Sequence, residues 1–466
     1  MQNSGPLVFL GLAIIATTAI AILVPYLRRT SDILSAWNIF LLGGSMFMGV
    51  GCLAVAYGDF HWPELQWFQP SQSDVRNYVL GAVTFYGTLY LCYFWFSWPK
   101  RLVANFMNKW PPMSNSFLIF CVAVFVLLAF AALATHGIPI LSSLFFNISH
   151  KAIVFGVVFT FCHWYQDKRK LPLLLLFLGM FAFAGLFAMV EFRGRRLLLS
   201  VAVAPLICMY WLHWRYLPPL KNVMRLGFAT LLAFTVTVVY SSFRHFDAAP
   251  GEFSARTFGS TIQALKTVQL DKAFEYVRQN MFFYFSQYCT HYSLLTIQLV
   301  DNGQIEVEPL NTLAFLAAYP VPRVLWENKP QALGGRMVTE VLRLPYRTNW
   351  GLGIVGNCYH EGGLPVVVLY AVLMVLGIRV LDDALVRQPN NVFLLGILCT
   401  SAPHFAALIR GDPTNMSAEI IESFAFAWGL GLIGRFLFGT SVVTGTTRVT
   451  PPGNPSAAGR MRQPGR

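Results

Sequence analysis

Long apolar runs separated by short polar connections cover most of this chain. Runs of about 17 to 25 residues are long enough to cross the hydrocarbon core of a membrane as α-helices. Eleven such runs can be read, at residues 6–27, 32–57, 78–98, 116–135, 146–165, 171–191, 197–214, 226–243, 353–378, 392–409 and 420–439. The pattern therefore predicts an all-α polytopic membrane protein with about eleven transmembrane helices.

The fifth run, at residues 146–165, is the weakest of these predictions. Lys151 lies inside it, and the clean apolar stretch after this lysine is only about 14 residues long. A re-entrant segment is therefore an alternative to a full transmembrane helix at this position.

One polar stretch, residues 244–352, interrupts the alternation. It separates an N-terminal bundle of about eight helices, residues 1–243, from about three C-terminal helices within residues 353–440. Its aromatic and leucine content indicates order, and a long ordered loop is usually functional. Residues 271–300 predict a helix ended by Asp301-Asn-Gly. We expect its aromatic side chains to pack on neighbouring spans, with sugar contact as the alternative.

Composition and charge exclude a soluble protein and orient the chain. Of its 466 residues, 56% are hydrophobic and 12% are charged, which is too little polar surface for a soluble globule. The formal net charge is +13, and the basic excess gathers on alternate connections, so that side is expected to be cytoplasmic. The N-terminus and the large loop are then external, and the tail at residues 441–466 is expected to be cytoplasmic, basic and disordered. Because topology explains the excess, nucleic acid is not expected as a partner.

The sequence offers no motif for a cofactor. It contains no Gly-rich loop that would cradle a phosphate, no Cys/His spacing typical of zinc and no external acidic cluster suited to a divalent metal. We therefore expect neither a metal nor another cofactor. Two of the eight cysteines, Cys289 and Cys358, fall on the outer side, and whether they form a disulfide stays open.

Basic residues also occur on the outer side, where topology does not call for them. Three arginines lie within residues 191–196, Arg410 follows the tenth run, and residues 323–347 are dense in arginine. Contact with lipid headgroups is the alternative for each of them. The planar guanidinium suits recognition of phosphate, and a lipid diphosphate leaves readily when preorganised donors stabilise its developing charge. These residues therefore favour transfer of a group that a lipid diphosphate activates.

Two segments at the end of the loop resemble a known family. The segment from Leu310 to Pro330 resembles the signature loop of O-antigen and exopolysaccharide repeat-unit polymerases of the Wzy type. In that family a Pro-Arg, a hydrophobic-Trp step and a Lys-Pro follow one another, and these are here Pro322-Arg323, Leu325-Trp326 and Lys329-Pro330. Residues 351–363 are similar to the family's entry into the next helix, except that Asn357 stands where an acid is usual.

The resemblance implies a GT-C-like membrane glycosyltransferase in the bacterial inner membrane. Such an enzyme polymerises undecaprenyl-diphosphate-linked oligosaccharide repeats on the periplasmic face, without a metal, and would work with the lipid bilayer, a chain-length regulator and a flippase. The candidate diphosphate-binding residues are Arg193, Arg195, Arg196, Arg323, Lys329, Arg336 and Arg410. The candidates for the base that takes the proton of the attacking sugar hydroxyl are His360, Glu361 and Asp412. For the His and Glu, an ordinary role at a helix end is the alternative.

Two other functions remain open from the sequence. An O-antigen ligase-type glycan transferase uses the same donor and the same arginine chemistry, but transfers the glycan to a different acceptor. A polysaccharide or solute transporter is the alternative from another class, and it is expected to carry ionisable residues near the membrane midplane. The predicted spans are nearly free of internal acids, and His404 is the one midplane anomaly, which favours an enzyme over a transporter.

Overall fold

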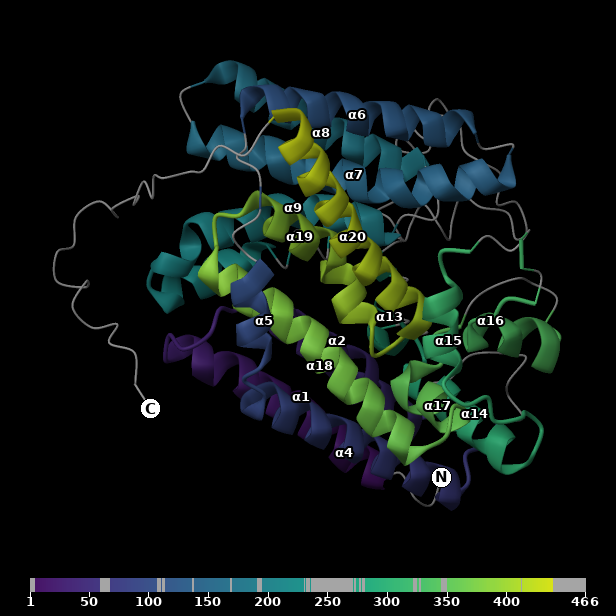
Figure 1. The fold of residues 1–466 in the computed structure, drawn as a ribbon. Helices are drawn as coiled ribbons and strands as arrows, with labels where there is room; N and C mark the ends of the chain where they lie inside the picture. Colours follow the sequence, from purple (N-terminus) through teal and green to yellow (C-terminus); the bar gives the residue numbers. More distant parts are fainter. Residues whose placement is uncertain are drawn as a thin grey trace.

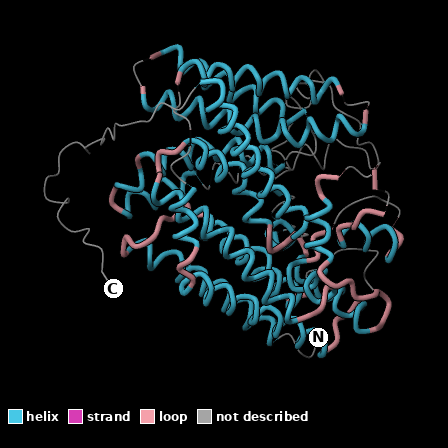
Figure 2. Tube along the Cα trace, viewed as in Figure 1, coloured by secondary structure: helices cyan, strands magenta, loops and turns pink. Residues whose placement is uncertain are grey.

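The computed structural model consists of helices and their connections throughout the part of the chain that it describes (Figures 1 and 2). That part comprises residues 5–58, 68–106, 110, 114–135, 138–167, 170–190, 195–229, 231, 235, 271, 274–275, 278, 281–321, 325–326, 328–344, 350–411 and 413–438. No strand occurs among these residues. The expected all-α class is confirmed.

Within the described residues, seven helical segments are long and apolar enough to cross a membrane. They are α1 (Gly5–Leu27), the consecutive α2 (Ala36–Gly44), η1 (Ser45–Val50) and α3 (Gly51–Ala56), α6 (Asn115–Ala134), α7 (Pro139–Gln166), α8 (Leu171–Val190), α18 (Leu364–Arg387) and α20 (Pro413–Phe438). The helix α4 (Gln72–Trp95) has a similar length and carries several tyrosines. Two shorter apolar helices, α9 (Arg195–Leu212) and α19 (Val392–Ala407), lie among them. The chain is a helical membrane protein, and the full count of eleven spans stays a prediction.

The short helix α19 occupies the centre of the bundle. It packs against α2, α7, α9 and α20, and nearly all of its residues are buried. Its sequence is apolar on every face, as expected of a helix surrounded by others. On one side of it α6, α7 and α8 pack together, and on the other side α4 and α18 form a closely packed pair (Figure 1).

Capping side chains in the sequence fix where several helices begin. Ser71 starts α4 with a capping box, in which its hydroxyl and the Asp74 carboxylate each accept from the other residue's backbone N–H. Asn391 caps α19 with its side-chain oxygen, which accepts from the backbone N–H groups of Phe393 and Leu394. The start of α2 is capped from another helix, because Asp382 accepts hydrogen bonds from the backbone N–H groups of Ala36 and Trp37.

The described part of the large loop gathers at one end of the bundle, called here the loop end. It comprises α13 (Met281–Ser286), α14 (Cys289–Asp301), α15 (Asn311–Ala318), α16 (Leu333–Arg336) and η5 (Met337–Val341), and α17 (Gly353–His360) follows it (Figure 1). The remaining short elements are α5 (Pro99–Phe106) and η4 (Trp214–Tyr216). The connection from α19 to α20 is also at the loop end, because the carbonyls of Ile409 and Arg410 accept from Ile354 and Gly353 of α17.

The helix α14 is part of the bundle and not an exposed platform. Almost all of its residues are buried against α17, α4 and α3. Gly356 permits the contact with α17, since a Cβ there would lie 2.7 Å from the Cα of Ser293. Tyr292 stacks on Trp350 with ring centroids 4.4 Å apart. The expectation that these aromatic residues pack within the protein is confirmed for Tyr288 and Tyr292, whereas the side chains of Phe283 and Tyr284 lie outside the described residues.

Several predicted helix boundaries are wrong. The helix expected over residues 271–300 is interrupted, because Gln287 and Tyr288 adopt left-handed backbone angles between α13 and α14; its expected end at Asp301 is correct. The span expected at 353–378 is two helices, α17 and α18, separated by a turn in which Gly362 and Gly363 have positive φ. The last span starts at Pro413 instead of residue 420. Most of the predicted span at 226–243 lies outside the described residues.

Candidate functional site

Glu361 lies at the centre of a buried polar network between the loop and the bundle. The network begins in the turn after α17, where the Glu361 side chain points away from solvent and is only 1% exposed. Its carboxylate accepts from the backbone N–H of Thr312 at 3.0 Å, the hydroxyl of Thr312 at 2.6 Å and the side-chain amide of Asn357 at 2.6 Å. The hydroxyl of Tyr370 in α18 donates to the same carboxylate. Glu361 thereby joins α15, α17 and α18.

Its neighbours leave Glu361 little capacity for proton transfer. Burial raises the pKa of this carboxyl, and the hydrogen bonds from Thr312, Tyr370 and Asn357 oppose that shift. A general base needs a lone pair that substrate can reach, whereas both oxygens of Glu361 are already occupied. The contacts therefore favour a positioning role over the predicted role as base.

His360 and Arg336 belong to a second group beside this network, in which His360 is buried and the charged side chains are partly exposed. Arg336 forms ion pairs with Glu308 and, at 3.7 Å, with Glu340. The His360 side chain is fully buried, and its backbone carbonyl accepts from Glu308 N–H at 3.2 Å. Burial lowers the pKa of His360; the charge of Glu308 opposes this and the charge of Arg336 adds to it. The structure thus brings His360 and Arg336 together, but Arg336 is already paired with carboxylates.

Lys329 is also engaged by the protein itself. Its ammonium group donates to the carbonyls of Tyr319 at 2.8 Å and Val321 at 2.9 Å, immediately after α15. It lies 5.3 Å from the centroid of the Tyr319 ring and is 8% exposed. These contacts fix the end of α15, where a cation also compensates the helix dipole.

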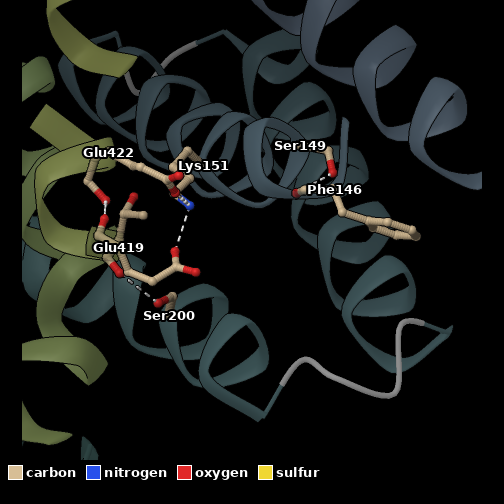
Figure 3. Close-up of polar contacts among 8 residues, drawn as sticks. Phe146, Ser149, Lys151, Ser200, Glu419 and Glu422 are labelled. Carbon is tan, nitrogen blue, oxygen red and sulfur yellow. Dashed lines mark hydrogen bonds and ion pairs between the residues drawn. The ribbon is translucent and has the colours of Figure 1, made fainter. Parts of the chain in front are cut away.

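A charged cluster that the sequence did not point to lies within the membrane helices. Lys151 of α7 is 3% exposed at its side chain and forms ion pairs with two carboxylates of α20, Glu419 at 2.6 Å and Glu422. The two glutamates are three residues apart, so they share one face of α20. Figure 3 shows the Lys151 ammonium group between the two carboxylates, with Ser200 of α9 nearby.

Further titratable groups surround this cluster from four other positions. The charges of Arg196 on α9, Glu419, Lys151 and His150 act on the ring of His404 in α19. Tyr319, at the end of α15, has the side chains of Glu422 and Asn147 as hydrogen-bonding neighbours. Burial raises the pKa of Tyr319 first, and the charges of Glu422 and Glu419 add to that effect. The cluster therefore connects α7, α9, α19 and α20 to the loop helix α15.

The position of the glutamates along α20 places the cluster towards the loop end. The helix has 26 residues, which corresponds to about 39 Å, whereas the hydrocarbon core is about 30 Å thick. Glu419 and Glu422 are in its second and third turns, so on a centred helix they lie roughly 5 Å and 9 Å inside the loop-side boundary of that core. Their side chains are 24% and 28% exposed, in contrast to the buried Lys151. The carboxylates are therefore open on one side.

The other predicted site residues are placed only in part. Arg410 follows α19 at the loop end, with its guanidinium 5.9 Å from the centroid of the Phe47 ring. Arg195 begins α9, and its side chain lies outside the described part of the chain. Arg193, Arg323 and Asp412 lie outside the described residues altogether. Their predicted roles stay predictions.

Two findings correct the sequence reading. The expectation that the spans are nearly free of internal acids is wrong for the last span. Glu422 already lies within the predicted run at residues 420–439, and α20, which begins at Pro413, also includes Glu419. The run with Lys151 is not re-entrant; it forms the continuous 28-residue helix α7. A lysine within one apolar run, together with two acids three residues apart in another, was the available signal for this ion cluster.

Cysteines and metals do not contribute further groups here. All eight cysteines are described, buried and free, so Cys289 and Cys358 are not joined. Within the described ranges, no three His, Cys, Asp or Glu side chains form a group that could hold a metal ion. No family model matches this chain, and neither a curated protein nor a solved structure shows detectable similarity to it. The resemblance to repeat-unit polymerases therefore rests on the loop residues alone.

Proposed function

We propose that this protein is a membrane glycosyltransferase that polymerises oligosaccharide repeats carried on undecaprenyl diphosphate. The observation that carries the proposal is the ion cluster of Lys151, Glu419 and Glu422, which lies directly beneath the loop helix α15. The loop segment that resembles the polymerase signature is continuous with this helix. Membrane-embedded carboxylates and the first part of the signature-like segment thus meet at one place.

The reaction requires three features that this place offers. Cations must stabilise the charge on the leaving diphosphate, a base must accept the hydroxyl proton, and water must be largely excluded. Arg196 supplies a cation next to the cluster, and the partly exposed glutamates supply carboxylates. The surrounding helices are apolar, and a carboxylate in such surroundings interacts with charges more strongly than it would in water.

The membrane placement follows from the same proposal. A donor on a C55-type lipid carrier lies in the bilayer with its diphosphate at the surface, on the loop side of Glu419 and Glu422. We assign the loop end to the periplasmic face of the bacterial inner membrane, with the N-terminus periplasmic and the C-terminus cytoplasmic, because the basic excess lies on the opposite connections. A chain-length regulator and a flippase are the partners expected of such a polymerase.

The ion cluster also favours a function from a different class. Ionisable residues within membrane helices mark proton and ion pathways in transporters, and Lys151, Glu419 and Glu422 are residues of this kind. A polysaccharide or solute transporter is therefore the second candidate. The cluster lies towards one end of α20 and not at its middle, which favours the enzyme.

Deleting the gene in the source bacterium distinguishes these functions. A polymerase mutant is expected to display single repeats on the surface, as seen by gel electrophoresis of the glycan. A ligase mutant accumulates lipid-linked polymer that is not transferred, and a transporter mutant retains its lipid-linked glycan or solute on the cytoplasmic side. Normal surface glycan and unimpaired transport would contradict all three functions.

The signature-like loop predicts one decisive side chain. Arg323→Ala should abolish polymer at normal protein levels, because the guanidinium is expected to bind diphosphate. Arg278→Ala is the matched control, since Arg278 is a loop arginine with a largely exposed side chain paired only with Glu275 among the described residues. Both variants are compared by glycan gel in the deletion strain. Wild-type polymer in the Arg323 variant would remove this residue from the site.

A further inference from the structure

Glu419 and Glu422 share Lys151 but have different other neighbours. Glu419 lies on the inner side of the cluster, where Lys151 and the rings of His404 and His150 are its neighbours. Glu422 lies instead beside Tyr319 of the loop, while its second contact is Lys151. One glutamate therefore faces the interior of the bundle, and the other faces the loop.

From this asymmetry we infer that Glu422 accepts the proton of the attacking sugar hydroxyl, and that Tyr319 positions it. The inference rests on the proposed function and replaces the loop candidates for the base with a residue of a membrane helix. Lys151 holds both carboxylates in place from its buried position. Glu419 then serves as the fixed counter-charge of Lys151.

The proposed step is balanced without any further reactant. The acceptor hydroxyl attacks the anomeric carbon of the donor, and its oxygen forms the new glycosidic bond. The bond between that carbon and the diphosphate oxygen breaks, and the leaving diphosphate takes its electron pair. The hydroxyl proton passes to a carboxylate oxygen of Glu422 and later to water at the partly exposed side of the cluster.

The pH dependence of the proposed step depends on all titratable side chains of the cluster around Glu422. Lys151 of α7 is paired with Glu422, and Tyr319 of α15 lies beside it. Glu419 shares Lys151 with Glu422, and the remaining titratable groups, His150, His404 and Arg196, lie on the side of the cluster where Glu419 and His404 are neighbours. A base must be deprotonated to act, so polymerisation that depends on a carboxylate base should fall on acidification. A glutamine side chain does not titrate as a carboxylate does, so the Glu422→Gln variant should lose this pH dependence.

The test uses the full-length protein in unsealed membrane vesicles of the deletion strain. The probe is the lipid-linked repeat extracted from that strain, and polymer is measured per folded molecule, with folded protein quantified by size-exclusion chromatography in detergent. Glu422→Gln should lower the rate about 100-fold or more and flatten the acid limb of the pH profile. Glu422→Asp should recover part of the rate and restore the pH dependence.

Two controls separate this role from a structural one. Glu419→Gln alters the same ion cluster but should retain the pH dependence, because it leaves Glu422 in place. Glu275→Gln removes a half-exposed loop carboxylate and should leave the rate unchanged. Tyr319→Phe should lower the rate less than Glu422→Gln does, since it removes only the hydroxyl beside the carboxylate.

Failure of the inference and failure of the proposed function give different results. If the deletion strain loses polymer but Glu422→Gln polymerises at more than half the wild-type rate, or keeps the wild-type pH profile, the inference is overturned and the proposed function stands. If the deletion strain makes normal polymer, the proposed function falls and the inference falls with it.

Discussion

Two carboxylate centres in the described part of this protein, Glu361 and Glu422, differ in what surrounds them. Glu361 is closed: neutral donors from Thr312, Asn357 and Tyr370 occupy its oxygens, and 1% of the residue is exposed. Glu422 is open: it is paired with one lysine and 28% of its side chain is exposed. A carboxylate whose oxygens all accept hydrogen bonds from neutral donors holds helices together. A carboxylate that is paired with one cation and partly exposed can still accept a proton from a substrate.

The same difference predicts that the two centres respond differently to mutation. Removing one partner of a buried ion pair leaves an uncompensated charge, which costs more than a lost neutral hydrogen bond. The ion cluster should therefore be sensitive to loss of its lysine. Mutations in the Glu361 network should lower the free energy of unfolding less, and they should leave the reaction rate per folded molecule nearly unchanged.

The largest stability effect is expected from Lys151→Met. It leaves Glu419 and Glu422 next to each other without their cation, which should cost about 3–5 kcal/mol. Thermal unfolding of the detergent-solubilised protein measures this loss. Adding Glu419→Gln and Glu422→Gln to Lys151→Met should recover much of it, because no charge is then left unpaired; a triple variant as unstable as the single one would contradict the ion-pair account.

A smaller effect is expected from Glu361→Gln. The amide group of glutamine cannot accept from all the donors that now converge on Glu361, and a buried unsatisfied donor costs about 1–3 kcal/mol. Activity per folded molecule should stay within about twofold of wild type, since the network holds α15 but takes no proton. Measuring unfolding and polymerisation on the same preparation checks both parts. A large loss of rate without loss of stability would assign Glu361 a chemical role.

The smallest predicted effect is a dependence of folding stability on pH that His360 causes. Burial lowers the pKa of His360 in the folded protein from its ordinary value of 6.5, so below that pH the unfolded chain takes up a proton that the folded protein resists. The contribution of His360 to the free energy of unfolding is zero at pH values well above the ordinary pKa of histidine. It disfavours the folded state as the pH falls below that value. Glu361, whose pKa is raised, acts in the opposite direction. Comparing wild type with the His360→Asn variant isolates the contribution of the histidine to stability. The unfolding temperatures of the two proteins, measured at two pH values, should lie closer together at the lower pH.

A pH-independent difference between wild type and His360→Asn would show that His360 is not buried as a neutral ring. It would also weaken the distinction between the two centres, because His360 and Glu361 are adjacent at the closed one. The comparison needs no substrate, so it can be made before the glycan is known.

The sequence predicted the class of this protein well, because length and apolarity alone determine whether a helix can cross a membrane. Residues 6–27 and 171–191 are almost the helices α1 and α8. Boundaries failed where local signals were weak. Gly362-Gly363 lies within an otherwise continuous apolar stretch, and Pro413 begins α20 in a polar segment.

The candidate site was less predictable than the fold. A sequence shows that Glu361 is an acid next to a histidine, but only tertiary packing brings Thr312 and Tyr370 to its oxygens. Lys151 and Glu422 are separated by 271 residues along the chain, so no local pattern could pair them. Their ion pair arises because α7 and α20 meet at the loop end, which no spacing rule anticipates.

The most direct test compares Glu422→Gln with Glu361→Gln in the deletion strain, with polymer measured by glycan gel and divided by the amount of folded protein. Our account predicts that the Glu422 variant loses polymer about 100-fold or more, while the Glu361 variant keeps wild-type polymer per folded molecule. The reverse result, with polymer lost only in the Glu361 variant, would contradict the central claim that the open carboxylate, and not the closed one, takes part in the reaction.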